Sequence, residues 1–206
     1  MGINFSRITL TAGLAAVLSL PAAAATVNWQ IDPQHSSAQF SVRHMAISTV
    51  RGAFNKVTGT IALDDKDITK STVDVNIDVT TVDTHEPGRD SDLRSDKFFD
   101  VAHFPTMTFK STRVEQLAPG KLKVTGDLTI RGTTKEVVLD VEGPTAPVKD
   151  PWGNVRAAAS ASAKINRQDF GVKWNATLDN GGVVIGDDVN ITIDAEMTKQ
   201  AAKSTN

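Results

Sequence analysis

The sequence predicts an all-β domain in which about eight antiparallel strands close into a barrel, with one short helical segment near residues 88–100. After residue 26, most of the chain alternates apolar and polar residues with a period of two, which is typical of strands with one buried face. The strands are short, tight turns separate them, and no sequence repeat is present. Closure into a barrel is favoured because long open strands would leave exposed edges, although a two-sheet sandwich is an alternative.

The first 25 residues have the composition of a secretory signal peptide. Arg7 precedes an apolar run from Ile8 to Leu20, and small residues follow up to Ala25. The run is shorter than the ~20 apolar residues that a membrane span needs. We therefore expect cleavage near Ala25 and export of the chain. Residues 26–198 are expected to form the barrel and residues 199–206 a disordered tail.

Composition excludes several classes of partner. The formal net charge is -2, and no polybasic run is present. The sequence therefore predicts neither nucleic-acid binding nor stable membrane insertion. Cysteine is absent, so the fold must be stabilised by its core and by closure of the sheet rather than by disulfides.

The alternating segments follow one another along the whole chain. The expected strands cover residues 27–31, 38–44, 50–54, 57–63, 73–79, 107–118, 122–130, 137–141, 155–165 and 189–197. Gly52 and Gly59 lie inside strands, where glycine often marks a bend. We interpret both positions as barrel corners.

A charged segment from Val82 to Pro105 interrupts the alternation. Pro87 and Gly88 break the strand before it, and the position before Pro105 disfavours a helix at its end. Between these breaks, residues 91–98 have room for about two helical turns. A charged, partly helical segment between two strands predicts a cap at the mouth of the barrel.

One expected strand is built from small residues. The segment 155–165 places a row of alanines on one face, namely Ala157, Ala159, Ala161 and Ala163. In a packed interior such side chains would leave a void, and voids cost stability. Either a ligand fills this space or large neighbours do, the candidate neighbours being Phe40, Phe54 and Phe109.

An ordered set of motifs runs along the chain from residue 35 onwards. It includes His35-Ser36, Gly52-x-Phe54, Val82-Asp83-Thr84, Arg89-Asp90-x-x-Leu93-Arg94-Ser95, Phe98-Phe99-Asp100, Gly126-Asp127-Leu128-Thr129-Ile130-Arg131-Gly132, Arg167-x-Asp169-Phe170-Gly171 and Gly186-Asp187-x-Val189. Each motif is weak alone, but together their order and spacing are specific. The sequence resembles the YceI-like family over essentially this whole span.

The resemblance implies a lipocalin-like, eight-stranded antiparallel barrel with an elongated apolar pore. Family members are similar in holding long-chain lipids, including polyisoprenoids and isoprenoid quinones, and many are periplasmic and dimeric. The resemblance thus implies a lipid ligand, such as a polyprenyl lipid, an isoprenoid quinone or a fatty-acid derivative, with no other cofactor. It also implies a periplasmic protein that forms a homodimer. Many members carry His where this chain has Asp92, so the resemblance does not imply a contact to a head group from that position.

Two sets of ligand-binding residues follow as hypotheses. The pore is expected to be lined by residues from Phe40, Val42, His44, Phe54, Val75, Ile77, Met107, Phe109, Leu128, Ala159 and Ala161. The mouth is expected to present His85 and Arg89, whereas Asp90 is expected to fasten the helical segment. Arg167 and Asp169 are expected to form a structural pair. Alternation gives the period of each strand and not the face that points inward.

The sequence predicts a binding protein rather than an enzyme. The four histidines, at positions 35, 44, 85 and 103, do not have a metal-ligand spacing, and no nucleophile elbow or P-loop is present. The favoured function is a periplasmic carrier for a long-chain amphiphile. The alternative is a stress-response interaction protein with a solid core and no ligand. A hydrolase or metal protein using His85 and His103 is a third hypothesis.

Overall fold

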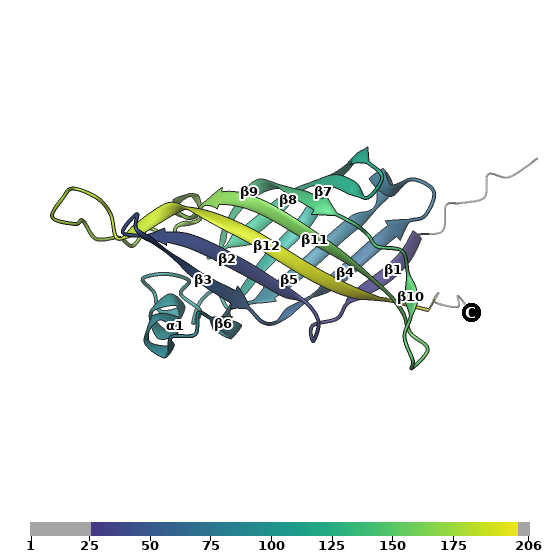
Figure 1. Cartoon of the computed structure of the whole chain (residues 1–206), viewed down its shortest axis with the longest axis horizontal. Coiled ribbons are helices and arrows are strands. Elements are labelled where there is room, and N and C mark those ends of the chain that lie inside the picture. Colours follow the sequence, from purple (N-terminus) through teal and green to yellow (C-terminus); the bar gives the residue numbers. More distant parts are fainter. Residues whose placement is uncertain (1–25, 202–206) are drawn as a thin grey trace, which may run out of the picture.

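The chain winds into one closed antiparallel barrel that is longer than it is wide (Figure 1). The computed structural model describes residues 26–201. The expected signal peptide, residues 1–25, lies outside the described residues, as do residues 202–206 of the expected tail. Within the described part, no helix has the length and apolar character to cross a membrane.

Twelve strands and one α-helix make up the described fold. The strands are β1 Thr26–Ile31, β2 Ser37–His44, β3 Ser48–Phe54, β4 Val57–Asp64, β5 Thr72–Asp78, β6 Val82–Asp83, β7 Thr106–Ala118, β8 Lys121–Ile130, β9 Thr133–Glu142, β10 Val148–Lys149, β11 Val155–Asn166 and β12 Ile185–Lys199. The helix α1 covers Pro87–Arg94, and three 3-10 turns, η1 Ile68–Lys70, η2 Val79–Thr81 and η3 Arg167–Phe170, lie between strands.

These strands form an eight-stranded wall, because four wall strands are each made of two pieces. β1 continues into β2, β3 into β4, β5 into β6 and β9 into β10, each pair after a break, and β9 and β10 both pair with β11. On one side β12 pairs with β11. On the other side it pairs with β2 along its first part and with β1 at its end, and this pairing of the last strand with the first closes the barrel. All strand pairs are antiparallel. Apart from this closing pair, each joins wall strands that follow one another along the chain. The predicted eight-stranded antiparallel barrel is confirmed, and the sandwich alternative is wrong.

A break between β3 and β4 keeps the apolar residues inside the barrel. Even-numbered residues up to Phe54 line the interior on β2 and β3, whereas odd-numbered residues from Val57 line it on β4. The change occurs at Asn55 and Lys56, outside both strands. An unbroken strand would turn the apolar residues of β4 outwards to solvent, because side chains alternate between faces with a period of two.

Helix α1 begins earlier than the sequence pattern indicated. We expected a helix over residues 91–98, but it begins at Pro87 and ends at Arg94. The Glu86 carboxylate accepts hydrogen bonds from the backbone N–H groups of Gly88 and Arg89, and so caps the first turn. Proline is tolerated in the first turn because its missing N–H would have no partner there. Pro87 therefore starts a helix and is not the break that the sequence pattern predicts.

Side-chain hydrogen bonds fix α1 to β6. The buried Asp90 carboxylate accepts from the backbone N–H of Thr84 (2.9 Å) and from its hydroxyl (2.6 Å). Arg89 donates to the same hydroxyl (2.7 Å) and to the Thr84 carbonyl oxygen (2.9 Å). Arg94 donates to the carbonyl oxygens of Thr80 and Val82. The helix is therefore held at one end of the barrel, called here the α1 end; the opposite end, which carries η1, is called the η1 end (Figure 1).

A charge network ties three segments together outside the barrel. Arg156 donates to the carboxylates of Asp32 (2.7 Å), Glu196 (2.6 Å) and Asp150 (2.8 Å). His35 also contacts Asp32, at 2.9 Å. The hydrogen bond from Arg156, followed by that from His35, lowers the pKa of Asp32 to about 2. The network joins the β1–β2 turn, the β10–β11 loop and β12.

Replacing Arg156 should destabilise the protein more at neutral pH than at pH 3. For Arg156→Gln we expect the free energy of unfolding at pH 7 to fall by about 2 kcal/mol, since hydrogen bonds to charged groups contribute about 1.5–3 kcal/mol. Asp32 has a lower pKa in the folded than in the unfolded chain, so its contribution is complete above about pH 4 and is lost as the pH falls towards 2. Urea unfolding at pH 7, 4 and 3 measures both effects.

Arg113→Gln is the matched control, because Arg113 pairs with Glu115 with both side chains largely exposed. This variant should lose less than about 1 kcal/mol at every pH. A deficit for Arg156→Gln that stays constant from pH 7 to pH 3 would contradict the assigned role of the network.

Candidate ligand-binding cavity

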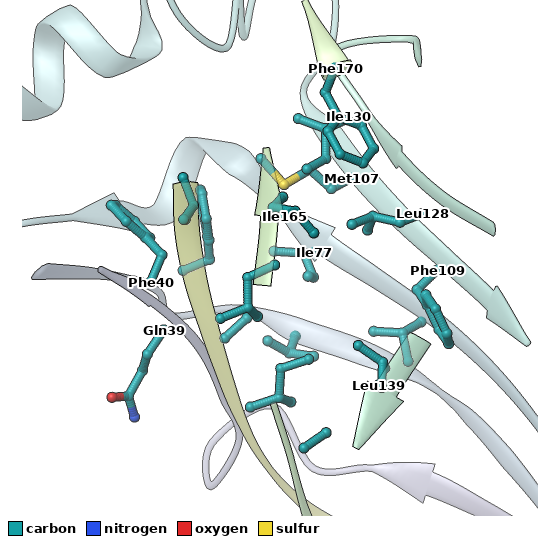
Figure 2. Close-up of a pocket in the computed structure, with 18 of the residues that line it drawn as sticks. Gln39, Phe40, Ile77, Met107, Phe109, Leu128, Ile130, Leu139, Ile165 and Phe170 are labelled. Carbon is teal, nitrogen blue, oxygen red and sulfur yellow. The ribbon is translucent and has the colours of Figure 1, made fainter. Parts of the chain in front are cut away.

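An elongated cavity of about 800 Å³ runs through the inside of the barrel. Its wall extends from Ile68 and Ser71 at the η1 end to Arg89 and Lys97 at the α1 end. Figure 2 shows side chains such as Ile77, Met107 and Leu128, from β5, β7 and β8, pointing into a common space. Among the labelled residues of this view, Gln39 is the polar one. Most residues of the cavity wall are apolar.

All the residues expected in the pore lie on the cavity wall. They are Phe40, Val42, His44, Phe54, Val75, Ile77, Met107, Phe109, Leu128, Ala159 and Ala161. The structure thus supplies what alternation could not, the inward face of each strand. Contact between these side chains and a ligand stays a prediction.

The two ends of the cavity differ in their exposure. At the η1 end the wall includes the buried Ser71 and half-buried Ile68 and Pro144. At the α1 end it includes Arg89 and Lys97, whose side chains reach the surface, together with Asp92. The cavity therefore reaches the solvent beside α1, where an apolar interior meets a charged rim.

The two residues expected at the mouth are separated by the structure. Arg89 lies on the cavity wall and is held by Thr84. The His85 side chain is 93% exposed and contacts Asp83 (3.4 Å). His85 also has a positive φ of 61° and donates its backbone N–H to the Asp83 carboxylate. This local turn holds the His85 ring in solvent, so His85 is not part of the cavity wall.

Several aromatic residues of the site were not in the expected set. Phe98 and Phe99, which follow α1, lie on the cavity wall together with Trp174. Phe54 contacts Phe99 edge to face at 5.6 Å between ring centroids, and Phe98 lies 5.4 Å from Trp174. The apolar pair Phe98-Phe99 in a charged segment is a sequence signal that could have been used. Trp174 lies in a connection without alternation, so the sequence carried no comparable signal for it.

Small residues keep the interior open. Ala159 of β11 lies opposite Ala195 of β12, so two small side chains face the cavity side by side. Gly52 lies opposite Phe40, and a Cβ atom on Gly52 would lie 2.5 Å from the tip of the Phe40 ring. The ring therefore lies against the barrel wall and leaves the centre free. The alternative of a solid core, in which large neighbours fill the space beside Ala159, is wrong.

Arg167 organises the long connection before β12. It is 6% exposed and donates hydrogen bonds to four carbonyl oxygens, those of Val172, Trp174, Ile185 and Gly186. Its carboxylate partner is Asp187, at 3.2 Å, rather than the expected Asp169. Burial lowers the pKa of Arg167. Asp187 lies near the start of β12, and the long connection folds back so that it lies close to Arg167. A local sequence pattern could not indicate this pairing.

One group of potential metal ligands lies outside the cavity. The ligand atoms of Asp32, His35 and Glu196 lie within 4.8 Å of one another. The Arg156 guanidinium binds both carboxylates through the same oxygens that lie next to His35. A positive side chain thus already occupies the place that a metal ion would take.

The family comparison agrees with this geometry. The family model described as YceI-like domain matches residues 29–197. The chain belongs to the YceI-like family. A UPF0312 protein of Vibrio cholerae serotype O1 is 39% identical to this YceI-like chain over 169 residues, which cover 81% of this chain and 89% of the relative.

Two solved structures have the same fold. The YCEI protein of Campylobacter jejuni is similar with a TM-score of 0.65 and 32% identity, covering 77% of this chain and 90% of that one. A polyisoprenoid binding domain from Saccharophagus degradans, implicated in plant cell wall breakdown, is similar with a TM-score of 0.62 and 16% identity, covering 84% and 98%. The second likeness concerns the fold alone. The YceI-like barrel is thus shared by chains of low sequence identity.

Adding a methyl group at Gly52 should disturb the Phe40 ring. For Gly52→Ala we expect a loss of about 1–3 kcal/mol in the free energy of unfolding, because the new Cβ would overlap Phe40 and also lie 2.7 Å from Thr84 Cγ2. Urea unfolding measures this loss. In the double variant Gly52→Ala/Phe40→Leu, the shorter side chain should recover part of it, so the two changes are not additive.

Gly186→Ala is the control, since a Cβ there lies 3.3 Å from its nearest neighbour and should cost less. Strictly additive effects of the changes at Gly52 and Phe40 would contradict the packing described for this wall.

Proposed function

We propose that this protein is a periplasmic carrier that holds one long-chain amphiphile, such as an isoprenoid quinone or a polyprenyl lipid. The apolar tail lies in the cavity, and the polar head lies at the α1 end. The observation that carries this proposal is the open apolar cavity of about 800 Å³. Among the described wall residues, the charged ones form a rim at the α1 end. The polyisoprenoid binding domain of Saccharophagus degradans, which has the same fold, supports the same class of ligand.

The size of the cavity sets the scale of affinity. At roughly 30 Å³ for each water-sized group, 800 Å³ holds on the order of 25 heavy atoms. At about 0.3 kcal/mol per heavy atom, their burial contributes roughly 8 kcal/mol, which corresponds to a dissociation constant near 1 μM. An exposed ion pair at the head group adds about 0–1 kcal/mol. The tail therefore determines affinity, and the mouth determines orientation.

Location and assembly belong to the same proposal. The sequence of residues 1–25 supports export, and a periplasmic carrier would move a lipid through an aqueous compartment. The resemblance to dimeric family members supports a homodimer. Binding without catalysis fits a wall made of hydrocarbon side chains, which can bury a tail but offer few groups for chemistry.

Extraction of the purified full chain with organic solvent, followed by mass spectrometry, tests the proposal. We expect a stoichiometric amphiphile with a long apolar tail. Delipidated protein should take up the same class of lipid again on incubation. Repeated absence of lipid in the extract, together with no uptake by delipidated protein, would overturn the carrier function.

A bulky side chain in the cavity should block uptake. For Ala161→Phe we expect at least a tenfold weaker affinity, since the ring takes the space of several heavy atoms at about 0.3 kcal/mol each and closes the lumen. Ser162→Phe is the control, because Ser162 is the next residue of β11 and its side chain is exposed. Titration of delipidated protein with a fluorescent polyene fatty acid measures both. Equal affinities for the two variants would contradict a ligand site inside the barrel.

A further inference from the structure

The barrel carries an exposed projection at its α1 end, called here the tip. It consists of residues 43–51, which include the β2–β3 turn, and residues 171–185, which connect η3 to β12. The two segments are joined by a hydrogen bond from the Met45 N–H to the Val184 carbonyl oxygen (2.8 Å). In Figure 1 the longer segment projects beyond the barrel on the left, beside the β2–β3 turn.

Large apolar side chains of the tip face the solvent. Ile47 is 76% exposed, Val183 47% and Trp174 40%. Met45 and Leu178 line a shallow pocket of about 270 Å³ between the two segments. Val183 lines the same pocket, and apolar side chains gathered on a surface indicate an interaction site.

The charge of the tip is opposite to that of the rest of the chain. Its two segments contain three basic residues, Arg43, Arg51 and Lys173, and one acidic residue, Asp179, so their formal net charge is +2. The whole chain has a net charge of -2, which leaves -4 outside the tip. All three basic side chains are exposed. The tip therefore combines an apolar surface with a local positive charge.

The tip is also part of the cavity mouth and is held rigid. Trp174 and Val184 lie on the cavity wall, and Trp174 packs against Phe98. Arg167 binds the carbonyl oxygens of Val172, Trp174 and Ile185 from inside. The Asn175 side chain donates to the Ile185 carbonyl oxygen (2.7 Å) and accepts from its N–H (3.0 Å). The exposed apolar groups are thus presented in a fixed arrangement next to the entrance.

We propose that the tip docks on the surface of an anionic lipid bilayer. Tryptophan is favoured at the boundary between head groups and acyl chains, and basic residues are attracted by anionic head groups. Docking would bring the mouth of the cavity onto the membrane, so that a lipid tail enters without crossing bulk water. This purpose rests on the proposed function, but the docking surface stands on its own residues.

Sedimentation with vesicles tests the proposal without any cavity ligand. The full chain is mixed with vesicles of phosphatidylcholine containing phosphatidylglycerol, or with vesicles of phosphatidylcholine alone. We expect the protein to bind the anionic vesicles, with an affinity that falls as salt is added. Its affinity for the neutral vesicles should be about tenfold lower. For Ile47→Asp/Val183→Asp we expect at least a tenfold loss of binding to the anionic vesicles.

Leu117→Asp/Val148→Asp is the matched control. Leu117 and Val148 are 60% and 63% exposed and lie at the η1 end, so the variant adds the same two charges far from the tip. We expect it to bind anionic vesicles within about twofold of the unchanged protein. Equal losses in both double variants, or no binding of the unchanged protein to either vesicle, would overturn the proposal and leave a protein partner as the occupant of the tip.

Organic extraction of the same preparations separates this proposal from the proposed function. Vesicle binding by a protein whose extract holds no lipid and that takes none up would support docking and overturn the carrier function. Lipid in the extract of a protein that binds no vesicles would support the carrier function and overturn docking. Circular dichroism of each variant verifies that the barrel is folded.

Discussion

The structure depends on closure of the sheet around a space that its own side chains do not fill. The ladders of β12, with β11 on one side and with β1 and β2 on the other, remove the free edges and fix the circumference of the wall. Inside this wall, Ala159 faces the cavity next to Ala195, and the Phe40 ring lies against Gly52. Because the backbone cannot contract without breaking the ladder, small residues on the inner face produce a lasting void rather than a collapsed core.

The two ends of the barrel are built differently, and this difference gives the cavity a direction. At the η1 end, the wall residues named above are buried or half-buried. At the α1 end, Thr84 holds both Arg89 and Asp90, and Arg167 holds the connection before β12 by its carbonyl oxygens. The mouth is therefore formed by irregular segments that buried polar side chains hold in place. Such hydrogen bonds commonly order segments that lack regular secondary structure.

The sequence was sufficient for the strands, because period-two alternation reports directly on a half-buried strand, but the inward face of each strand came from the structure. It was insufficient wherever the outcome depended on long-range geometry. Pro87 reads equally as a strand breaker or a helix start, and the Glu86 cap decides between them. Arg167 pairs with Asp187 across a long connection rather than with its neighbour Asp169. His85 is turned into solvent by its hydrogen bond to Asp83, which no periodicity records.

The most direct measurement of the central claim is a crystal structure of the full chain purified without organic solvent. The account predicts continuous elongated electron density along the cavity, bounded by Phe40, Met107 and Ala161, with any polar end beside α1. A barrel whose walls have moved inward, or whose phenylalanine rings have turned to fill the space between β11 and β5, would contradict it.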